Sequence, residues 1–170
     1  KKILFVVNVD WFFISHRLPL ALEALKRGYE VHIACEISDK KEYLENLGLK
    51  VHPLNISRSG TGIKGELKAF VEIYKVLKKI TPDIAHFVTI KPVLYGGIAS
   101  RFLGSFRKVF AISGLGFVFV AQTLKAKIVR TIVKAMYKIA LGGKNSHVIV
   151  QNPEDKKVIL YLPTWRDYNY

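Results

Sequence analysis

Cysteine and methionine are almost absent, because the 170 residues contain one of each. A lone cysteine, Cys35, excludes a disulfide scaffold and a cysteine-built zinc site. Long apolar runs are missing too: no segment approaches the roughly 20 consecutive apolar residues of a transmembrane helix. The apolar segment at the amino terminus ends at Asn8 and is too short for a secretion signal. The sequence therefore predicts a single globular domain in the cytoplasm.

Acidic residues are scarce and unevenly placed. The chain has 13 Asp and Glu against 27 Lys and Arg, which gives a formal net charge of +14. No acidic residue occurs between Ile84 and Pro153, a stretch that carries ten lysines and arginines. This asymmetry favours an anionic partner, such as nucleic acid, anionic lipid or a phosphorylated ligand. The alternative is a solvated basic surface that serves only solubility.

Several well-known catalytic and cofactor motifs are absent. No Gly-x-Gly-x-x-Gly follows the first predicted strand, and the chain has neither a P-loop nor a Gly-x-Ser-x-Gly elbow. The five histidines do not have metal-ligand spacing, so no metal site is predicted. His32, His52 and His147 fall within predicted strands, where a structural role is expected. No known nucleic-acid motif occurs, and no specific nucleic-acid partner is predicted.

Apolar runs alternate with helical patterns every 25 to 30 residues or so. The predicted strands span 3–7, 30–35, 50–54, 83–88, 108–112, 147–150 and 158–162. The predicted helices span 15–27, 38–47, 66–80, 93–103 and 120–141. This alternation predicts an α/β domain of the Rossmann-like type, with a doubly wound, mostly parallel sheet. The domain is predicted to span 1–153, with 154–170 as a linker, a tail or the start of a second domain.

The first predicted helix begins at a candidate binding site. In an open parallel sheet, ligands bind at the carboxyl ends of the strands. Ser15 is the predicted N-cap of this helix, and His16 and Arg17 follow it directly. Free amide groups and a partial positive charge at a helix N-terminus, with both side chains beside them, predict an anion or hydroxyl site. Alternatively, His16 only packs against the aromatic residues at 11–13.

Three further segments follow predicted strands and are expected at the same edge. Lys91 comes directly after the fourth strand and is a candidate catalytic cation, or else an ordinary exposed lysine. Gly114, Leu115 and Gly116 follow the fifth strand, where glycines allow a ligand close to the backbone. That pattern is also typical of an ordinary tight turn. Asn152 follows the sixth strand and is included among the predicted binding residues.

The long helix predicted over 120–141 is amphipathic and basic. Its apolar stripe contains Leu124, Ile128, Ile132, Ala135 and Ile139. Its basic face contains Lys127, Arg130, Lys134 and Lys138. A basic amphipathic helix is typical of contact with an anionic membrane surface, at roughly 1 kcal/mol per basic residue. A core helix with a solvated basic face gives the same pattern.

Four sequence segments together resemble the N-terminal half of a GT-B glycosyltransferase of family 4, of the type that extends lipid-linked sugars for capsule, O-antigen or glycoprotein glycans. The segments are Lys2-Ile-Leu-Phe-Val-Val-Asn with Phe13-Ile-Ser-His-Arg-Leu-Pro-Leu-Ala, His86-Phe-Val-Thr-Ile-Lys-Pro with Tyr95-Gly96, Ile112-Ser-Gly-Leu-Gly-Phe-Val-Phe, and Val150-Gln-Asn-Pro-Glu-Asp. The resemblance covers about residues 2–157.

The resemblance implies a retaining transfer of sugar from a nucleotide-sugar donor to an acceptor hydroxyl, without a metal or other cofactor. In such enzymes the N-terminal half mainly holds the acceptor, here expected to be a lipid-diphosphate-linked saccharide, and meets the membrane. His16, Lys91 and the 114–116 loop are the candidates for stabilising the leaving diphosphate. The implied location is the inner face of the plasma membrane.

The family's donor-binding half, with its pair of glutamates, has no counterpart in these residues. The chain alone is therefore expected to lack full activity and to need a C-terminal donor-binding domain or a partner subunit. The segment 158–167 resembles the start of the second domain in CDP-glycerol glycerophosphotransferases. Two alternatives thus stay open: a glycerophosphotransferase-like fragment, and a non-catalytic, membrane-docked subunit of a split glycosyltransferase.

Overall fold

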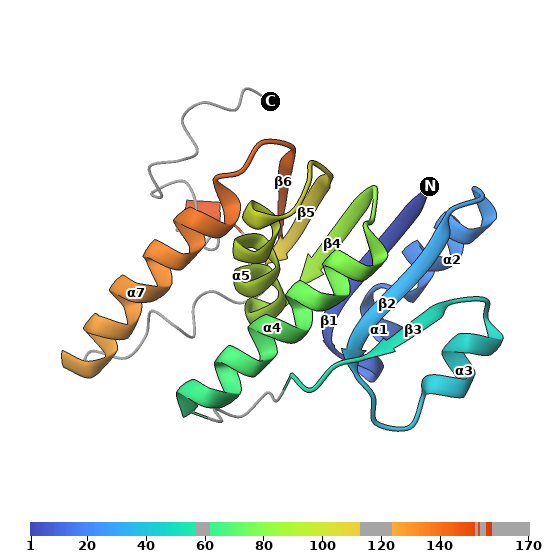
Figure 1. The fold of residues 1–170 in the computed structure, drawn as a ribbon, viewed down its shortest axis with the longest axis horizontal. Coiled ribbons are helices and arrows are strands. Elements are labelled where there is room, and N and C mark those ends of the chain that lie inside the picture. Colours follow the sequence, from blue (N-terminus) through green and yellow to red (C-terminus); the bar gives the residue numbers. More distant parts are fainter. Residues whose placement is uncertain (57–61, 113–123, 152, 154–155, 158–170) are drawn as a thin grey trace.

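The structure is a computed structural model that describes residues 1–56, 62–112, 124–151, 153 and 156–157 (Figure 1). Within 124–130 it describes the backbone only. Six strands form one sheet in the order β3-β2-β1-β4-β5-β6, and every neighbouring pair is parallel. The strands are β1 (Lys2–Val9), β2 (Glu30–Glu36), β3 (Lys50–Pro53), β4 (Ile84–Val88), β5 (Arg107–Ile112) and β6 (Ser146–Val150).

The helices cover both faces of the sheet. They are α1 (Asp10–His16), α2 (Leu18–Lys26), α3 (Lys41–Asn46), α4 (Gly62–Ile80), α5 (Ile90–Ala99), the 3-10 turn η1 (Ser100–Phe102) and α7 (Leu124–Leu141). Figure 1 shows α4, α5 and α7 side by side on one face. Leu4, Val6 and Phe87 lie in the core beneath them, whereas Phe5 and Val7 point to the core on the α1–α2 side. The sequence prediction of a doubly wound, parallel Rossmann-like domain is confirmed.

Two adjacent glycines in α5 allow close packing in two directions. A Cβ at Gly96 would lie 2.2 Å from the Phe87 ring on β4. A Cβ at Gly97 would lie 2.6 Å from the Cβ of Ala140 on α7. Both distances are far below ordinary contact distances. Helix α5 therefore sits deep between the sheet and α7 because these two positions lack side chains.

The beginning of the first helical region differs from the prediction. The residues before Ser15, expected to form a loop, instead form α1 from Asp10 onward, and Arg17 rather than Ser15 precedes the next helix, α2. The prediction of Ser15 as N-cap is therefore wrong. Its hydroxyl donates to the carbonyl of Phe12 within α1. Buried Phe13 and Asp10 anchor α1 to the domain, a tertiary effect that the polar, aromatic-rich pattern of this segment did not reveal.

Two other helices begin earlier than expected. Helix α5 starts at Ile90 rather than at residue 93, since Pro92 is tolerated in the first turn. Helix α4 starts at Gly62 rather than at residue 66. The strand expected at 158–162 lies outside the described residues. None of the described helices is long and apolar enough to cross a membrane.

The packed face of α7 is not the predicted apolar stripe. Ile132 and Ile139 are 54% and 48% exposed, and Ala135 between them is exposed as well. The core contact comes instead from residues on the other side of the helix, namely Val133, Met136, Tyr137, Ala140 and Leu141. The helix carries two apolar faces. The one with small Ala140 is selected because it fits against Gly97. Among the described side chains, the helix thus packs on the core with Lys134 and Lys138 exposed, as one alternative expected, but through a face other than the predicted stripe.

Candidate functional site

The chain reverses its winding direction between β1 and β4. From β1 it proceeds outward through β2 to β3, and from β4 it proceeds outward through β5 to β6. In open α/β sheets the crevice at such a switch point is the usual place for a ligand, at the carboxyl ends of the strands. Here those ends are Val9 of β1 and Val88 of β4. The residues that follow each strand, at 10–17 and 89–95, are consequently the first candidates.

A buried carboxylate fixes the first of these segments. Asp10 is fully buried and accepts hydrogen bonds from the backbone N–H of Trp11, Ser38 and Lys40 and from the Ser38 hydroxyl. Burial alone would raise the pKa of Asp10, but these hydrogen bonds outweigh it and lower the pKa below its ordinary value. Asp10 therefore ties α1 to the loop after β2 and has a structural role.

His16 is the last residue of α1, so it does not lie at a helix N-terminus as predicted. Its ring stacks on Phe12 at 4.2 Å between centroids, and its Nδ1 lies 2.6 Å from the Ser15 hydroxyl oxygen. Because that hydroxyl donates to the Phe12 carbonyl, the geometry favours donation from Nδ1–H to the Ser15 oxygen. The lone pair then resides on Nε2, on an exposed side chain. His16 therefore packs on an aromatic ring, as one alternative expected, and its Nε2 still lies on an exposed side chain.

Half-buried Arg17 and buried His86 place polar atoms without hydrogen-bond partners next to the switch point. Nε of Arg17 and Nε2 of His86 are both buried without a hydrogen-bond partner, and the same holds for Oδ1 of Asn8 at the end of β1. Burial, and then the charge of Arg17, lower the pKa of His86 to about 4, so the imidazole is neutral at pH 7. Burial lowers the pKa of Arg17 as well. Nη1 of this guanidinium donates a hydrogen bond to the carbonyl of His16 rather than to a carboxylate.

Lys91 is held in place rather than freely exposed. Its Nζ lies 2.8 Å from Oε1 of Glu66 on α4, and its side chain is 20% exposed. The Tyr95 hydroxyl donates to the other oxygen of the same carboxylate. Burial would raise the pKa of Glu66, but its hydrogen bonds with Lys91 and Tyr95 lower it. Glu66 thus links α4 to α5 and positions Lys91 at the carboxyl edge of β4.

The backbone is strained where β4 passes into α5. Thr89 has φ 74° and ψ 164°, a conformation that β-branched residues rarely adopt. This strain occurs at the switch point itself, between His86 and Lys91. Neither this strain nor the part played by Glu66 is evident from the sequence, whereas Asn8 and His86 could have been found from their places near the ends of buried strands.

The structure brings some of the predicted site residues to one edge. Ser15, His16 and Arg17 follow β1, and Lys91 follows the adjacent β4. Gly114, Leu115, Gly116 and Asn152 lie outside the described residues. Among the described residues, no group of three or more His, Cys, Asp or Glu side chains could hold a metal ion.

A cavity of about 580 Å³ opens at the opposite edge of the sheet. It is lined by residues at the beginnings of strands, including Ile84 and Arg107, and by Asn145 before β6. Parallel sheets bind ligands at the carboxyl edge, because the loops that vary in function and the helix N-termini are found there. The candidate site is therefore placed at the switch point, where buried polar atoms have no hydrogen-bond partner, and not at this cavity.

Comparison with protein families identifies one match over most of the chain. The family described as "Glycosyl transferase 4-like" matches residues 2–152. A similar protein is N,N'-diacetylbacillosaminyl-diphospho-undecaprenol alpha-1,3-N-acetylgalactosaminyltransferase of Campylobacter jejuni, 28% identical over 81% of this chain and 39% of its own length. Another is UDP-N-acetylglucosamine--N-acetylmuramyl-(pentapeptide) pyrophosphoryl-undecaprenol N-acetylglucosamine transferase of Rickettsia felis, 27% identical over 77% of this chain and 43% of its own length.

Solved structures share the fold at low sequence identity. Sucrose-phosphate synthase from Thermosynechococcus elongatus superposes with a TM-score of 0.64 at 13% identity, over 94% of this chain and 44% of that one. MurG of Acinetobacter baumannii superposes with a TM-score of 0.53 at 15% identity, over 76% of this chain and 39% of that one. This chain spans about two fifths of the length of the curated relatives it matches.

Proposed function

The chain belongs to the glycosyl transferase 4-like family, and we propose that it is the N-terminal, acceptor-binding half of a glycosyltransferase of the GT-B fold. The acceptor in this proposal is a lipid-diphosphate-linked saccharide, and the donor is a nucleotide-sugar. The names of two relatives support this choice, since both describe transfer to a saccharide on diphospho-undecaprenol or pyrophosphoryl-undecaprenol. In this proposal the sugar transfer is a step in the synthesis of bacterial surface polysaccharide or another lipid-linked glycan.

The observation that carries the proposal is that Nε of half-buried Arg17 and Nε2 of buried His86 are both buried atoms without a hydrogen-bond partner. A guanidinium that loses hydration without gaining a carboxylate is destabilising unless a ligand supplies the negative charge. Phosphate fits a guanidinium through paired N–H donors, and a neutral His86 can donate one further hydrogen bond. The N-terminus of α2, directly after Arg17, adds free amide groups and a partial positive charge. A diphosphate therefore fits the switch point better than an uncharged sugar does.

The same edge offers groups for the transfer itself. The reaction breaks the bond between the anomeric carbon and the donor's diphosphate and forms a bond from that carbon to the acceptor oxygen, whose proton passes to the departing diphosphate. In the proposal, Nε2 of His16 accepts a hydrogen bond from the acceptor hydroxyl and orients it. The Lys91 ammonium, held by Glu66, stabilises negative charge that develops on phosphate oxygens. Gly114, Leu115, Gly116 and Asn152 remain proposed ligand contacts on the basis of sequence.

The length of the relatives indicates that the proposed enzyme has a further part. Because the matched region is less than half of each relative, donor binding is assigned to a second domain or partner subunit beyond the residues matched here. A lipid-linked acceptor also requires the protein to work at a membrane surface. The proposed location is therefore the inner face of the plasma membrane, with peripheral attachment through anionic lipids.

The test is the affinity for a polyprenyl-diphosphate-linked N-acetylhexosamine in detergent, measured by isothermal titration calorimetry. Arg17→Gln is expected to weaken binding about tenfold or more, since it removes a charge-assisted contact. Arg27→Gln, at the other end of α2 and paired with Glu23 in solvent, is the matched control and leaves affinity unchanged. Equal affinity of the unaltered protein for the same lipid without phosphate would refute the proposal.

A further inference from the structure

Two basic side chains and a serine converge on the turn between α7 and β6. A Cβ built on Gly143 would meet three polar atoms at almost equal distances: Nη1 of Arg101 at 3.3 Å, Nζ of Lys108 at 3.3 Å and Oγ of Ser146 at 3.4 Å. The two cationic nitrogens are therefore no more than twice this 3.3 Å apart. Arg101 belongs to η1, Lys108 to β5 and Ser146 to β6. These three side chains around Gly143 are called the Gly143 cluster below.

Lys108 is buried without a negative partner. It shares the core-facing side of β5 with Phe110 and Ile112, because alternate residues of a strand point to the same side, and it is 8% exposed. Its Nζ lies 5.7 Å from the centroid of the Phe106 ring, a contact that supplies no hydrogen-bond acceptor of ordinary strength. Neither Lys108 nor Arg101 forms a salt bridge within the described residues. Burial, and then the charge of Arg101, lower the pKa of Lys108, so the charged form is disfavoured where it lies.

The elements around the Gly143 cluster supply no carboxylate. No Asp or Glu occurs between Ile84 and Pro153, and this stretch contains η1, β5, α7 and β6. Oγ of Ser146 is buried and has no hydrogen-bond partner within the described residues, so a third polar group beside the same point is unsatisfied. Buried polar groups and buried charges are costly unless a ligand or a partner satisfies them. The cluster therefore offers the hydrogen-bond donors and the positive charge that an anion requires.

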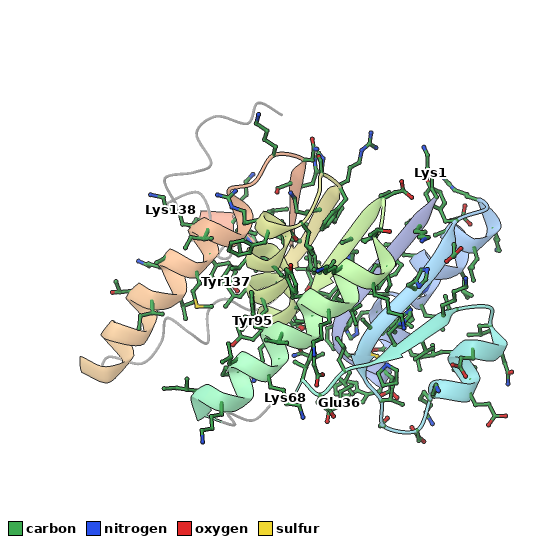
Figure 2. All side chains as sticks on the ribbon, viewed as in Figure 1. Lys1, Glu36, Lys68, Tyr95, Tyr137 and Lys138 are labelled. Atoms are coloured by element: carbon green, nitrogen blue, oxygen red, sulfur yellow. The ribbon has the colours of Figure 1, made fainter. Side chains whose placement is uncertain are left out.

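The turn that carries Gly143 is held in place by its neighbours. Tyr137 is buried near the end of α7, and Figure 2 shows it on the side of this helix toward α5, with Lys138 on the opposite side. Nη1 of Arg101 donates to the carbonyl of Gly142 at 3.0 Å, which fixes the guanidinium beside the turn. Because Gly143 lacks a Cβ, no side chain separates the three polar atoms at this residue. A site that is already arranged in this way needs little ordering when a ligand binds.

The Gly143 cluster lies at the amino edge of the sheet. Lys108 and Ser146 are paired in the parallel register at the beginnings of β5 and β6. Figure 1 shows the end of α7 and the beginnings of these two strands at the same edge. The proposed acceptor site, in contrast, follows the carboxyl ends of β1 and β4. The two sites are therefore at opposite edges of the sheet and have no residue in common.

We propose that the Gly143 cluster binds the phosphate group of a small ligand, either free phosphate or a phosphomonoester. A phosphate has enough oxygen atoms to accept hydrogen bonds from Arg101, Lys108 and Ser146 together, at donor–acceptor distances of about 2.8 Å. The guanidinium and the ammonium offset its charge, and the serine hydroxyl donates a further bond. Arg101 is the exposed member of the cluster, so the ligand enters from its side. The proposed function of the chain does not depend on this second site.

The first experiment follows the binding of inorganic phosphate through backbone amide chemical shifts in two-dimensional NMR, at constant ionic strength. Saturable shifts are expected within 142–146, and the amides of the acceptor site report separately on any binding there. Lys108→Met and Arg101→Gln are each expected to weaken phosphate binding at 142–146 about tenfold or more, because each removes a charge-assisted hydrogen bond. The matched control is Arg107→Gln, which removes an exposed charge from the opposite side of β5 and changes this affinity by less than about twofold.

The second experiment places a methyl group at the centre of the cluster. Gly143→Ala puts a Cβ 3.3–3.4 Å from the three polar atoms, where it competes with a phosphate oxygen, and it is expected to weaken phosphate binding about tenfold. Gly104→Ala is the matched control, because its Cβ would meet no atom within 4 Å. Neither glycine has a left-handed φ, so alanine fits the backbone at both positions.

The stability of Lys108→Met separates a ligand site from a structural lysine. In phosphate-free buffer this variant is expected to have a higher melting temperature than the unaltered protein, because it removes a buried charge that has no counter-charge. A lower melting temperature would show that the protein itself satisfies Lys108, and it would overturn the proposal.

Two results of the titrations would also overturn the proposal. One is that the amides of 142–146 do not respond to phosphate in a saturable way. The other is that acetate at the same concentration produces equal shifts, which would indicate a site for carboxylates or for anions in general. Glycerol 3-phosphate, titrated in the same way, distinguishes the two sources of phosphate. Tighter binding than that of inorganic phosphate assigns a phosphomonoester, and weaker binding assigns the free ion.

Discussion

The substitution Gly97→Ala tests whether α5 and α7 approach as closely as the structure shows. The added Cβ would lie 2.6 Å from Ala140 Cβ and 2.8 Å from both Cα and O of Ala140. Ordinary carbon contacts are about 3.5–4.0 Å, so the helices would have to separate by about 1 Å. Two of the three atoms belong to the backbone and cannot rotate away. Overpacking of this kind costs about 1–3 kcal/mol.

Helix propensity acts in the opposite direction. Alanine is favoured over glycine by about 1 kcal/mol within a helix, so a substitution without a clash would stabilise the protein. The net expectation for Gly97→Ala is a loss of about 1–2 kcal/mol in the free energy of unfolding, measured by urea denaturation followed by circular dichroism. Gly104→Ala, where an added Cβ meets no atom within 4 Å, is the control and stays within about 0.5 kcal/mol. Stabilisation by Gly97→Ala would refute the close approach.

Three further predictions concern buried or half-buried polar groups. Asp10→Ala leaves three backbone N–H groups and one hydroxyl without their acceptor, and it is expected to lower the free energy of unfolding by about 2–3 kcal/mol in urea denaturation. His86 has a pKa of about 4 in the folded protein against an ordinary 6.5, so it binds a proton more readily when the protein is unfolded. The free energy of unfolding should therefore fall by up to about 3 kcal/mol as the pH decreases from 6.5 through 4. The variant His86→Gln should flatten that part of the pH profile. Glu66→Gln removes the ion pair with Lys91 and is expected to cost about 1 kcal/mol in thermal melts, and to slow sugar transfer by the complete enzyme through the misplaced Lys91; an unchanged transfer rate would show that this pair does not position Lys91 for the reaction.

Much of the fold was predictable from the sequence because its signals are local. Continuous apolar strands such as 3–7 can only be buried on both faces, and glycines such as Gly28 end helices in a left-handed conformation. These patterns predict the order of elements and hence a parallel sheet. The topology also predicts that Lys91 and Arg17 lie at the same edge of the sheet, because the carboxyl ends of parallel strands lie together.

The errors arose where distant contacts decide the local structure. The segment before Ser15 forms a helix because Phe13 and Asp10 are buried by other parts of the chain, and neither contact can be read from the local pattern. The face of α7 that packs is chosen by Gly97, more than 30 residues before most of that helix. The part played by Glu66 depends on α4 lying beside α5. Each case is a tertiary contact overriding a correct but incomplete local pattern.

The most direct test of the account is to map where the acceptor binds. A polyprenyl-diphosphate saccharide that carries a photoreactive diazirine beside the diphosphate would be crosslinked to the protein, and the adducts located by peptide mass spectrometry. Binding of the acceptor at the switch point between β1 and β4 predicts adducts within 8–17 and 86–95. Adducts confined to the cavity at the opposite edge, near Asp83 and Arg107, would contradict it.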